Sequence, residues 1–161
     1  MGRLYTAQFN AVAVTAAQDF FEITAPSGAV VLIHEWEIFQ TSDFGDAQEE
    51  ILRIETVRGV GSTTSGSGGS TVTPQPIEDG DVAFGGTVEA NNTTRLAAGT
   101  GSLETLEQRG WNVRGPYVRI YTPETRPAVL PSARWTLSLP AAPADSLTTS
   151  GTVTFEVIGG A

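Results

Sequence analysis

The chain has 161 residues, enough for one well-buried domain, and no shift in composition divides it into two. Cysteine is absent, which excludes disulfides and thiolate metal sites. Nine basic residues against eighteen acidic ones leave a net charge of -9, which repels a phosphate backbone, so we expect no nucleic-acid partner. No window approaches the roughly 20 apolar residues of a membrane span, so we expect no membrane partner.

Alternation of apolar and polar residues predicts two strands near the start of the chain, over residues 4–14 and 19–24. The Pro-Ser-Gly turn at residues 26–28 leads into two longer strands, 30–40 and 51–57. In the first of these, the even-numbered residues from 30 to 38 form a largely apolar face.

Both long strands also carry apolar residues on their second face, which implies a covering layer or a neighbouring subunit. We therefore predict a subunit interface on these strands. Its candidate residues are Glu35, Glu37, Phe39, Ile51, Arg53 and Val57.

Residues 59–80 begin with a low-complexity Gly/Ser run and contain two prolines. We predict a flexible Gly/Ser-rich loop without regular structure, lying on the surface or against a partner. The domain prediction is thus a single β-sandwich over residues 1–161 that includes this loop.

Further strand signals, separated by polar or proline-rich connections, lie at residues 82–89, 103–114, 117–122, 135–139 and 153–157. The total is about eight or nine strands, with no sustained helical periodicity. These features predict an all-β fold, a two-sheet antiparallel sandwich of the jelly-roll type. An immunoglobulin-like sandwich is the alternative, but the Cys and Trp spacing of that fold is missing.

Catalytic signals are few. His34 is the only histidine, and its position in mid-strand beside Trp36 favours a core or interface role. Glu35 and Glu37 could do acid and base work on a glycoside, but two acids on one strand face are typical of a solvated surface. The acidic loops 43–46 and 78–81 lack the spacing of the twelve-residue calcium loop. We expect no enzyme activity, no cofactor and no metal site.

Several stretches spread over nearly the whole chain carry a family resemblance; they are residues 11–19, 40–43, 49–54, 89–94, 111–114 and 142–147. Together they resemble tailed-bacteriophage head decoration (cement) proteins. The resemblance implies a jelly-roll subunit that forms homotrimers and binds the major capsid protein on the capsid exterior. Minor tail or fibre proteins are similar in composition.

Two other functions compete with a structural virion protein that decorates or stabilises a phage capsid. A carbohydrate-binding β-sandwich module would present aromatic residues to sugars, and Trp111, Tyr117, Tyr121 and Trp135 are the candidates. A small double-sheet enzyme would gather several histidines around a metal, and this chain has one. For the capsid protein, we expect residues 59–80 and the first strand to contact the shell, because loops that order on a partner cover a large area.

Overall fold

The computed structural model describes residues 2–42 and 49–159, in which every regular element is a β-strand. The strands form two six-stranded antiparallel sheets, so the predicted all-β sandwich is confirmed. Its main strands are β1 Arg3–Val14, β2 Gln18–Thr24, β3 Ala29–Gln40, β4 Ile51–Val60, β8 Ser102–Asn112, β9 Tyr117–Ile120, β11 Arg134–Leu139 and β12 Leu147–Gly159. The shorter strands are β5 Ser70–Val72, β6 Gln75–Pro76, β7 Thr87–Asn92 and β10 Ala128–Val129.

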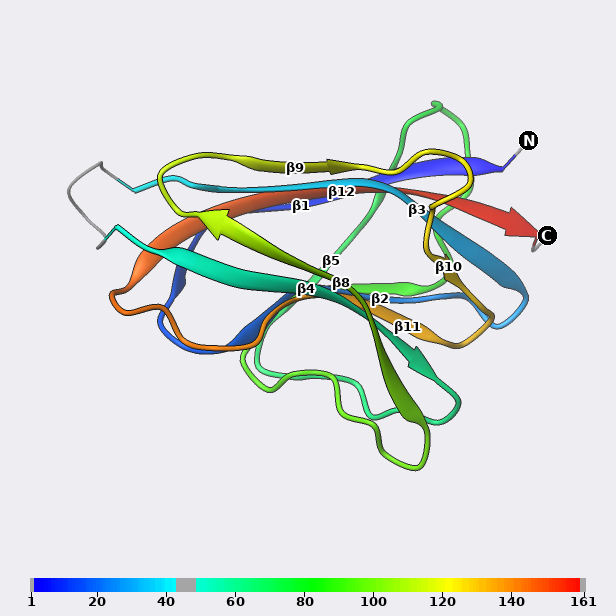
Figure 1. Cartoon of the computed structure of the whole chain (residues 1–161). Coiled ribbons are helices and arrows are strands. Elements are labelled where there is room, and N and C mark those ends of the chain that lie inside the picture. Colours follow the sequence, from blue (N-terminus) through cyan, green and yellow to red (C-terminus); the bar gives the residue numbers. More distant parts are fainter. Residues whose placement is uncertain (1, 43–48, 160–161) are drawn as a thin grey trace.

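Early strands pair with late ones in nested order. β1 pairs with β12, β2 with β11, β3 with β9 and β4 with β8, all antiparallel. The paired strands fold into two sheets. Their main strands follow the order β9-β3-β12-β1 in the first, which we call sheet A, and β8-β4-β11-β2 in the second, sheet B; these are the strand orders of a jelly roll. In Figure 1 the two sheets form the upper and lower layers of the sandwich. The short strands extend the sheet edges, with β10 and β6 in sheet A and β5 and β7 in sheet B.

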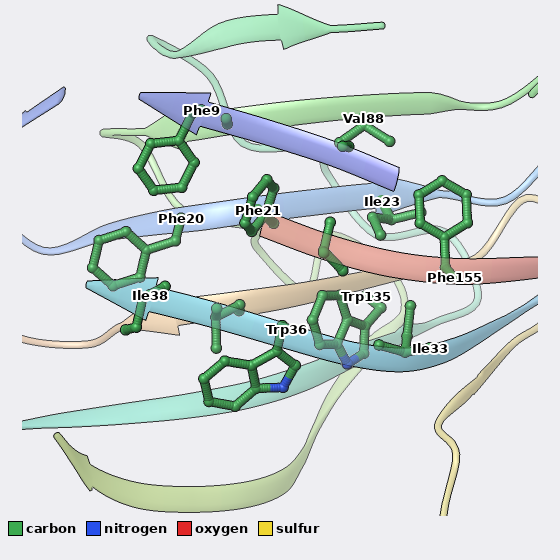
Figure 2. Packing of buried hydrophobic residues seen from close by; sticks show 14 of the residues in the cluster. Phe9, Phe20, Phe21, Ile23, Ile33, Trp36, Ile38, Val88, Trp135 and Phe155 are labelled. Atoms are coloured by element: carbon green, nitrogen blue, oxygen red, sulfur yellow. The ribbon is translucent and has the colours of Figure 1, made fainter. Parts of the chain in front are cut away.

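Large side chains from both sheets fill the space between them (Figure 2). Trp36 and Phe155 of sheet A and Phe21 and Trp135 of sheet B are all at most 1% exposed. Phe9 packs on Phe21 with ring centroids 5.1 Å apart. Burying one such side chain stabilises the fold by about 1.5–3 kcal/mol, so this core supplies the main driving force for the sandwich.

A β-bulge in β3 changes which residues face the core. Glu35 and Ile33 lie opposite consecutive residues of β12, which leaves His34 as an extra residue. Odd-numbered residues therefore face inward before the bulge and even-numbered ones after it, and Ile33 and Trp36 are both buried. The prediction that the even-numbered residues from 30 to 38 share one face is wrong, because Leu32 and His34 lie on the outer side of the sheet.

The connection between β4 and β8 contains more regular structure than we predicted. Residues 59–80 include β5, which pairs with β7, and β6, which pairs with β1. The expected strand at 82–89 begins later, at Thr87, and runs to Asn92, into the connection that we predicted to follow it. The prediction that residues 59–80 lack regular structure is therefore wrong, and their flexibility stays a prediction.

We expect Phe155→Ala to lower the free energy of unfolding by about 3–5 kcal/mol, because the truncated side chain leaves a cavity between the sheets. The matched control is Val118→Ala on β9, which removes apolar atoms from a side chain that is 52% exposed. It should change stability by less than about 0.5 kcal/mol. Urea unfolding curves measure both; similar losses for the two variants would contradict this account of the core.

Candidate functional site

The outer faces of the two sheets differ. The outer face of sheet A is uncovered over most of its length, with loops rising above it only at the right-hand end in Figure 1, whereas the outer face of sheet B is covered by part of the chain itself. Val118 and Ile120, on β9 at the edge of sheet A, are 52% and 64% exposed. The uncovered face of sheet A is therefore a candidate surface for binding a partner.

Strand register arranges the uncovered face in rows that cross β1, β12, β3 and β9. In each row, polar residues on β1 and β12 are followed by a glutamate on β3 and then by an exposed apolar residue on β9. One row is Thr6, Thr154, Glu35 and Ile120, and the next is Gln8, Thr152, Glu37 and Val118. Within the described residues neither glutamate has an ion-pair partner, and Glu35 accepts a hydrogen bond from the Thr154 hydroxyl at 3.3 Å.

The predicted interface residues are divided between the two sheets. Glu35, Glu37 and Phe39 lie on the outer face of sheet A. Ile51, which is 74% exposed, and Arg53 lie on β4, on the outer face of sheet B. The two groups therefore do not form one continuous patch on the subunit, although both are available to a partner.

One of the predicted interface residues, Val57, is already buried within the single chain. We expected this side chain to need a neighbouring subunit, but it is only 5% exposed in the single chain. It lies on the outer face of sheet B, beside the buried Thr136 of β11. The covering layer that the second apolar face implied is thus supplied here by the chain itself.

His34 lies on the uncovered face and not in the core. Its Nε2 is 2.9 Å from the Glu156 Oε2 atom, and its side chain is 20% exposed. The Gly2 N–H donates to the other oxygen of Glu156 at 3.0 Å, and Arg126 Nη1 lies 4.0 Å from Oε2. The histidine therefore belongs to a small ion-pair cluster, with no nucleophile among these contacts.

Two stretches of the β4–β8 connection, residues 61–69 and 93–101, lie against the outer face of sheet B (Figure 1). We call them the cover. Leu96 and Thr63, one from each stretch, are 7% and 8% exposed. Backbone bridges join the two stretches, at Thr64 with Ala97 and at Ser67 with Thr94.

Glu22 on β2 holds the first stretch of the cover. The Ser65 hydroxyl donates to Oε1 at 2.5 Å, and the Gly66 N–H donates to Oε2 at 2.8 Å. Arg134 Nε lies 3.4 Å from Oε1 on the other side. A Cβ atom at position 66 would lie 2.6 Å from the Thr94 carbonyl oxygen and 3.0 Å from Oε2, so only glycine fits this approach.

Asp19 and Arg95 hold the second stretch. The Leu96 N–H donates to Asp19 Oδ2 at 2.7 Å. Arg95 donates through Nε to the Ser138 hydroxyl at 2.8 Å and through Nη2 to Glu55 Oε1 at 3.1 Å. Burial raises the pKa of Asp19 above its ordinary value of 3.8, and Ser138, the Leu96 N–H and the charge of Arg95 offset only part of this rise.

A hydrogen-bonded cluster joins the free edges of the two sheets. Glu107 on β8 accepts from Arg119 Nη2 at 2.6 Å and from the Tyr121 hydroxyl at 2.8 Å. The Trp36 indole N–H donates to the same hydroxyl at 3.2 Å. Burial acts to raise the pKa of Glu107, but hydrogen bonds from Arg119, Tyr121 and Arg109 outweigh it and hold that pKa below 4.5. Burial, together with the Glu107 carboxylate, raises the pKa of Tyr121 to about 12.

The aromatic platform expected of a carbohydrate-binding module is not on the surface. Trp111 and Trp135 are 1% and 0% exposed, and Tyr121 is 4% exposed. Tyr117 is partly buried and stacks on Trp36 with ring centroids 5.4 Å apart. These residues form core contacts because both sheets direct them inward, so they do not support a sugar-binding function.

Three further apolar side chains are exposed, two in a loop beside β1 and one near the end of β12. Ile77 and Val82, in the loop that follows β6, are 57% and 56% exposed, and Ile158 at the end of β12 is 46% exposed. The Ile77 N–H donates to the Leu4 carbonyl oxygen, and the Tyr5 hydroxyl donates to the Val82 carbonyl oxygen. The loop therefore lies along β1, beside the two termini in Figure 1. We call Ile77, Val82 and Ile158 the apolar rim.

Neither a metal centre nor a membrane span emerges from the part of the chain that the structure describes. Across residues 2–42 and 49–159, no three His, Asp or Glu side chains are arranged to hold a metal ion. The same residues include no helix long and apolar enough to cross a membrane. The acidic loop at 78–81 is within this range, whereas the one at 43–46 lies outside the described residues.

A groove of about 600 Å³ runs between the β4–β8 edge and residues 128–133. Its charged side chains, Arg58 and Glu104, pair with each other at 2.6 Å, and its lining is otherwise small or apolar, as at Val60 and Leu130. Ser62 and Ser132 also line the groove, and among the described residues no hydrogen bond joins either hydroxyl to Glu104.

Glu107→Gln tests the cluster between the sheets. A carboxyl whose pKa is lowered by folding stabilises the protein above its unfolded value of 4.5, and the gain disappears as the pH falls through the folded pKa. We therefore expect the wild type to lose stability below about pH 4.5 more steeply than the variant. Urea unfolding across this pH range measures the difference. Parallel curves would show that Glu107 does not contribute to the acid sensitivity.

Comparison with known proteins identifies no family. No protein-family model and no curated protein sequence matches the chain. Among solved structures, it is similar to a chain of infectious bursal disease virus strain Gx, at 12% identity over 99% of this chain and 39% of that one, with a TM-score of 0.16. A chain of strain Gt is 15% identical over 99% and 42%, with a TM-score of 0.19. The VP2 subviral particle of the same virus is 15% identical over 98% and 42%, with a TM-score of 0.15. The chain thus spans 39–42% of the length of these proteins, and TM-scores this low carry no argument about function.

Proposed function

We propose that the protein is a structural component of a virus particle that decorates and stabilises the outer surface of a phage capsid. The observation that carries this proposal is the uncovered outer face of sheet A with the apolar rim at its end. Exposed apolar side chains beside a rigid sheet suit contact with another protein. The sequence resemblance to head decoration proteins points to the same role. The proposal assigns the protein no catalytic activity.

Charge supports the exterior location. A net charge of -9 facing packaged DNA would meet a dense field of the same sign, whereas outside the shell it keeps the particle soluble. The partner in this proposal is therefore the major capsid protein and not the genome.

The cover changes which part of residues 59–80 is offered to the capsid. Residues 61–69 are bonded to the buried Glu22, so they are not free to reach a partner without breaking those bonds. The apolar rim beside β1 is exposed. We therefore assign the capsid contact to the rim and to the neighbouring part of sheet A.

Binding to particles tests the proposal. The wild type should be present in purified virions of the phage that encodes it, and recombinant protein should bind both filled and emptied particles. Ile77→Ser combined with Val82→Ser should reduce occupancy at least about tenfold, since each lost apolar contact weakens binding by about 1 kcal/mol or more. Val60→Ser, at a 39% exposed site on another part of the surface, is the control. Binding only to opened particles would contradict the exterior location, and unchanged binding by the double variant would remove the rim's role.

We also propose that copies of the chain associate, as the predicted homotrimer requires. Glu35 and Glu37 lie beside exposed apolar residues on one sheet, and Arg53 lies beside exposed Ile51 on the other, so Arg53 offers a charge opposite to that of the two glutamates. Such a contact joins unlike surfaces of successive copies, and it forms a ring only if the rotation closes.

Charge reversal tests this association. Glu35→Lys with Glu37→Lys should weaken self-association, as should Arg53→Glu alone, because each places like charges in contact. The three changes in one chain should restore it. Glu78→Lys with Asp79→Lys, in an exposed loop, is the matched control for net charge. Analytical ultracentrifugation at micromolar concentration measures the effect; a monomeric wild type, or no rescue in the triple variant, would contradict the proposed contact.

A further inference from the structure

The outer face of sheet B is polar, yet it is closed from water. Register places Glu55, Ser138, Asp19 and Asn92 in one row across β4, β11, β2 and β7, and Val57, Thr136, Glu22 and Glu89 in the next. In these rows all but Glu89 are at most 9% exposed. Most buried sheet faces are apolar, so a buried face of this composition calls for a physical explanation.

Negative charge exceeds positive charge under the cover. The carboxylates facing this space are Asp19 and Glu22 on β2, Glu55 on β4 and Glu89 on β7; the cations are Arg95 from the cover and Arg134 from β11. The other side chains that bond to these groups, on Asn92, Ser138, Ser65 and Gln108, are neutral. Four carboxylates thus share two arginines in a space largely excluded from water, where an uncompensated charge is costly.

Asp19 is the least satisfied of these carboxylates. Its side chain is 1% exposed, and its Oδ1 atom lacks a hydrogen-bond partner among the described residues. Arg95 Nε lies 3.5 Å from Oδ1, but its hydrogen bond goes to the Ser138 hydroxyl. Oδ2 accepts the Leu96 N–H, which belongs to the cover.

We propose that the space beneath the cover is a proton-binding site centred on Asp19, and that binding the proton fastens the cover to sheet B. A proton on Oδ1 removes one surplus negative charge and turns this oxygen into a hydrogen-bond donor. Ser138, on the neighbouring strand β11, lies opposite Asp19 in the sheet register. Oδ2 keeps its lone pairs for the Leu96 N–H, so the bond to the cover remains.

The sign of the pH dependence follows from the rise in the pKa of Asp19 on folding. Between the folded pKa and the unfolded value of 3.8, the folded chain binds more protons at this group than the unfolded chain does. Stability therefore increases as the pH falls through the folded pKa, and the cover is held more firmly in mild acid than at neutral pH. This is opposite to the effect of Glu107, which acts only below 4.5. The inference does not depend on capsid binding.

NMR titration of the ¹⁵N-labelled full chain tests the proposal, with the proton as the ligand. The amide of Leu96 should shift with a midpoint above 3.8, and Asp19→Asn should abolish that titration. Arg95→Met should move the midpoint upward, since the arginine charge lowers the pKa of Asp19. Glu22→Gln removes a neighbouring negative charge that raises the pKa of Asp19, so it should lower the midpoint slightly without abolishing the titration. His34→Gln should leave it unchanged, because His34 lies on the other sheet.

Urea unfolding of the wild type and of Asp19→Asn gives a second measurement, which does not depend on whether Arg95→Met folds. The stability of the wild type relative to Asp19→Asn should rise as the pH falls toward 3.8, because the group whose pKa is raised by folding is present only in the wild type. A Leu96 midpoint at or below 3.8, or the same titration in Asp19→Asn, would overturn the proposal. A stability difference between the two chains that does not change with pH, or that changes in the opposite direction, would overturn it as well.

Discussion

The hydrogen bonds that buried carboxylates accept from the cover determine how this sandwich is built. Glu22 and Asp19 lie on the outer side of β2, and each accepts a backbone N–H from a different stretch of the cover. Without the cover, both groups would face solvent and sheet B would be an ordinary one-sided sheet. With it, the sheet is closed on both faces, and partners are left to the outer face of sheet A and to the uncovered end of β4.

This asymmetry gives the two faces separate roles. The covered face is held by many directed contacts within one chain, and its polar groups make it unsuited to an apolar partner. The uncovered face combines threonines, glutamates and exposed apolar residues in register, a composition closer to that of a protein interface rim than to that of a core. The buried polar contacts and the exposed side chains therefore lie on opposite sides of the same sandwich, so a change on one side need not disturb the other.

Alternation of apolar residues was sufficient to predict an all-β sandwich and most of its main strands, because alternation follows directly from the two faces of a strand. It could not reveal the polar layer under the cover. The acids of β2 stand among Phe20, Phe21 and Ile23, and nothing local shows that a segment more than forty residues away supplies their donors. Glycine and serine in that segment suggested flexibility, whereas Gly66 is needed for close approach to Glu22. Glu35, Glu37 and Phe39 lie on the uncovered outer face of sheet A, whereas Val57 lies on the outer face of sheet B and is only 5% exposed there, for the same reason.

The bulge at His34 makes the length of β3 as important as its composition. His34 is an extra residue in the pairing with β12. Ile33 before it and Trp36 and Ile38 after it can therefore all face the core. Loss of a single codon here would put the two halves of the strand out of phase, so that one of them would have to turn its large apolar side chains into water. Substitution at His34 disturbs a single side-chain contact, with Glu156, whereas deletion disturbs a whole strand. The register of β3 therefore depends on its residue count, and a substitution on its outer side leaves that register unchanged.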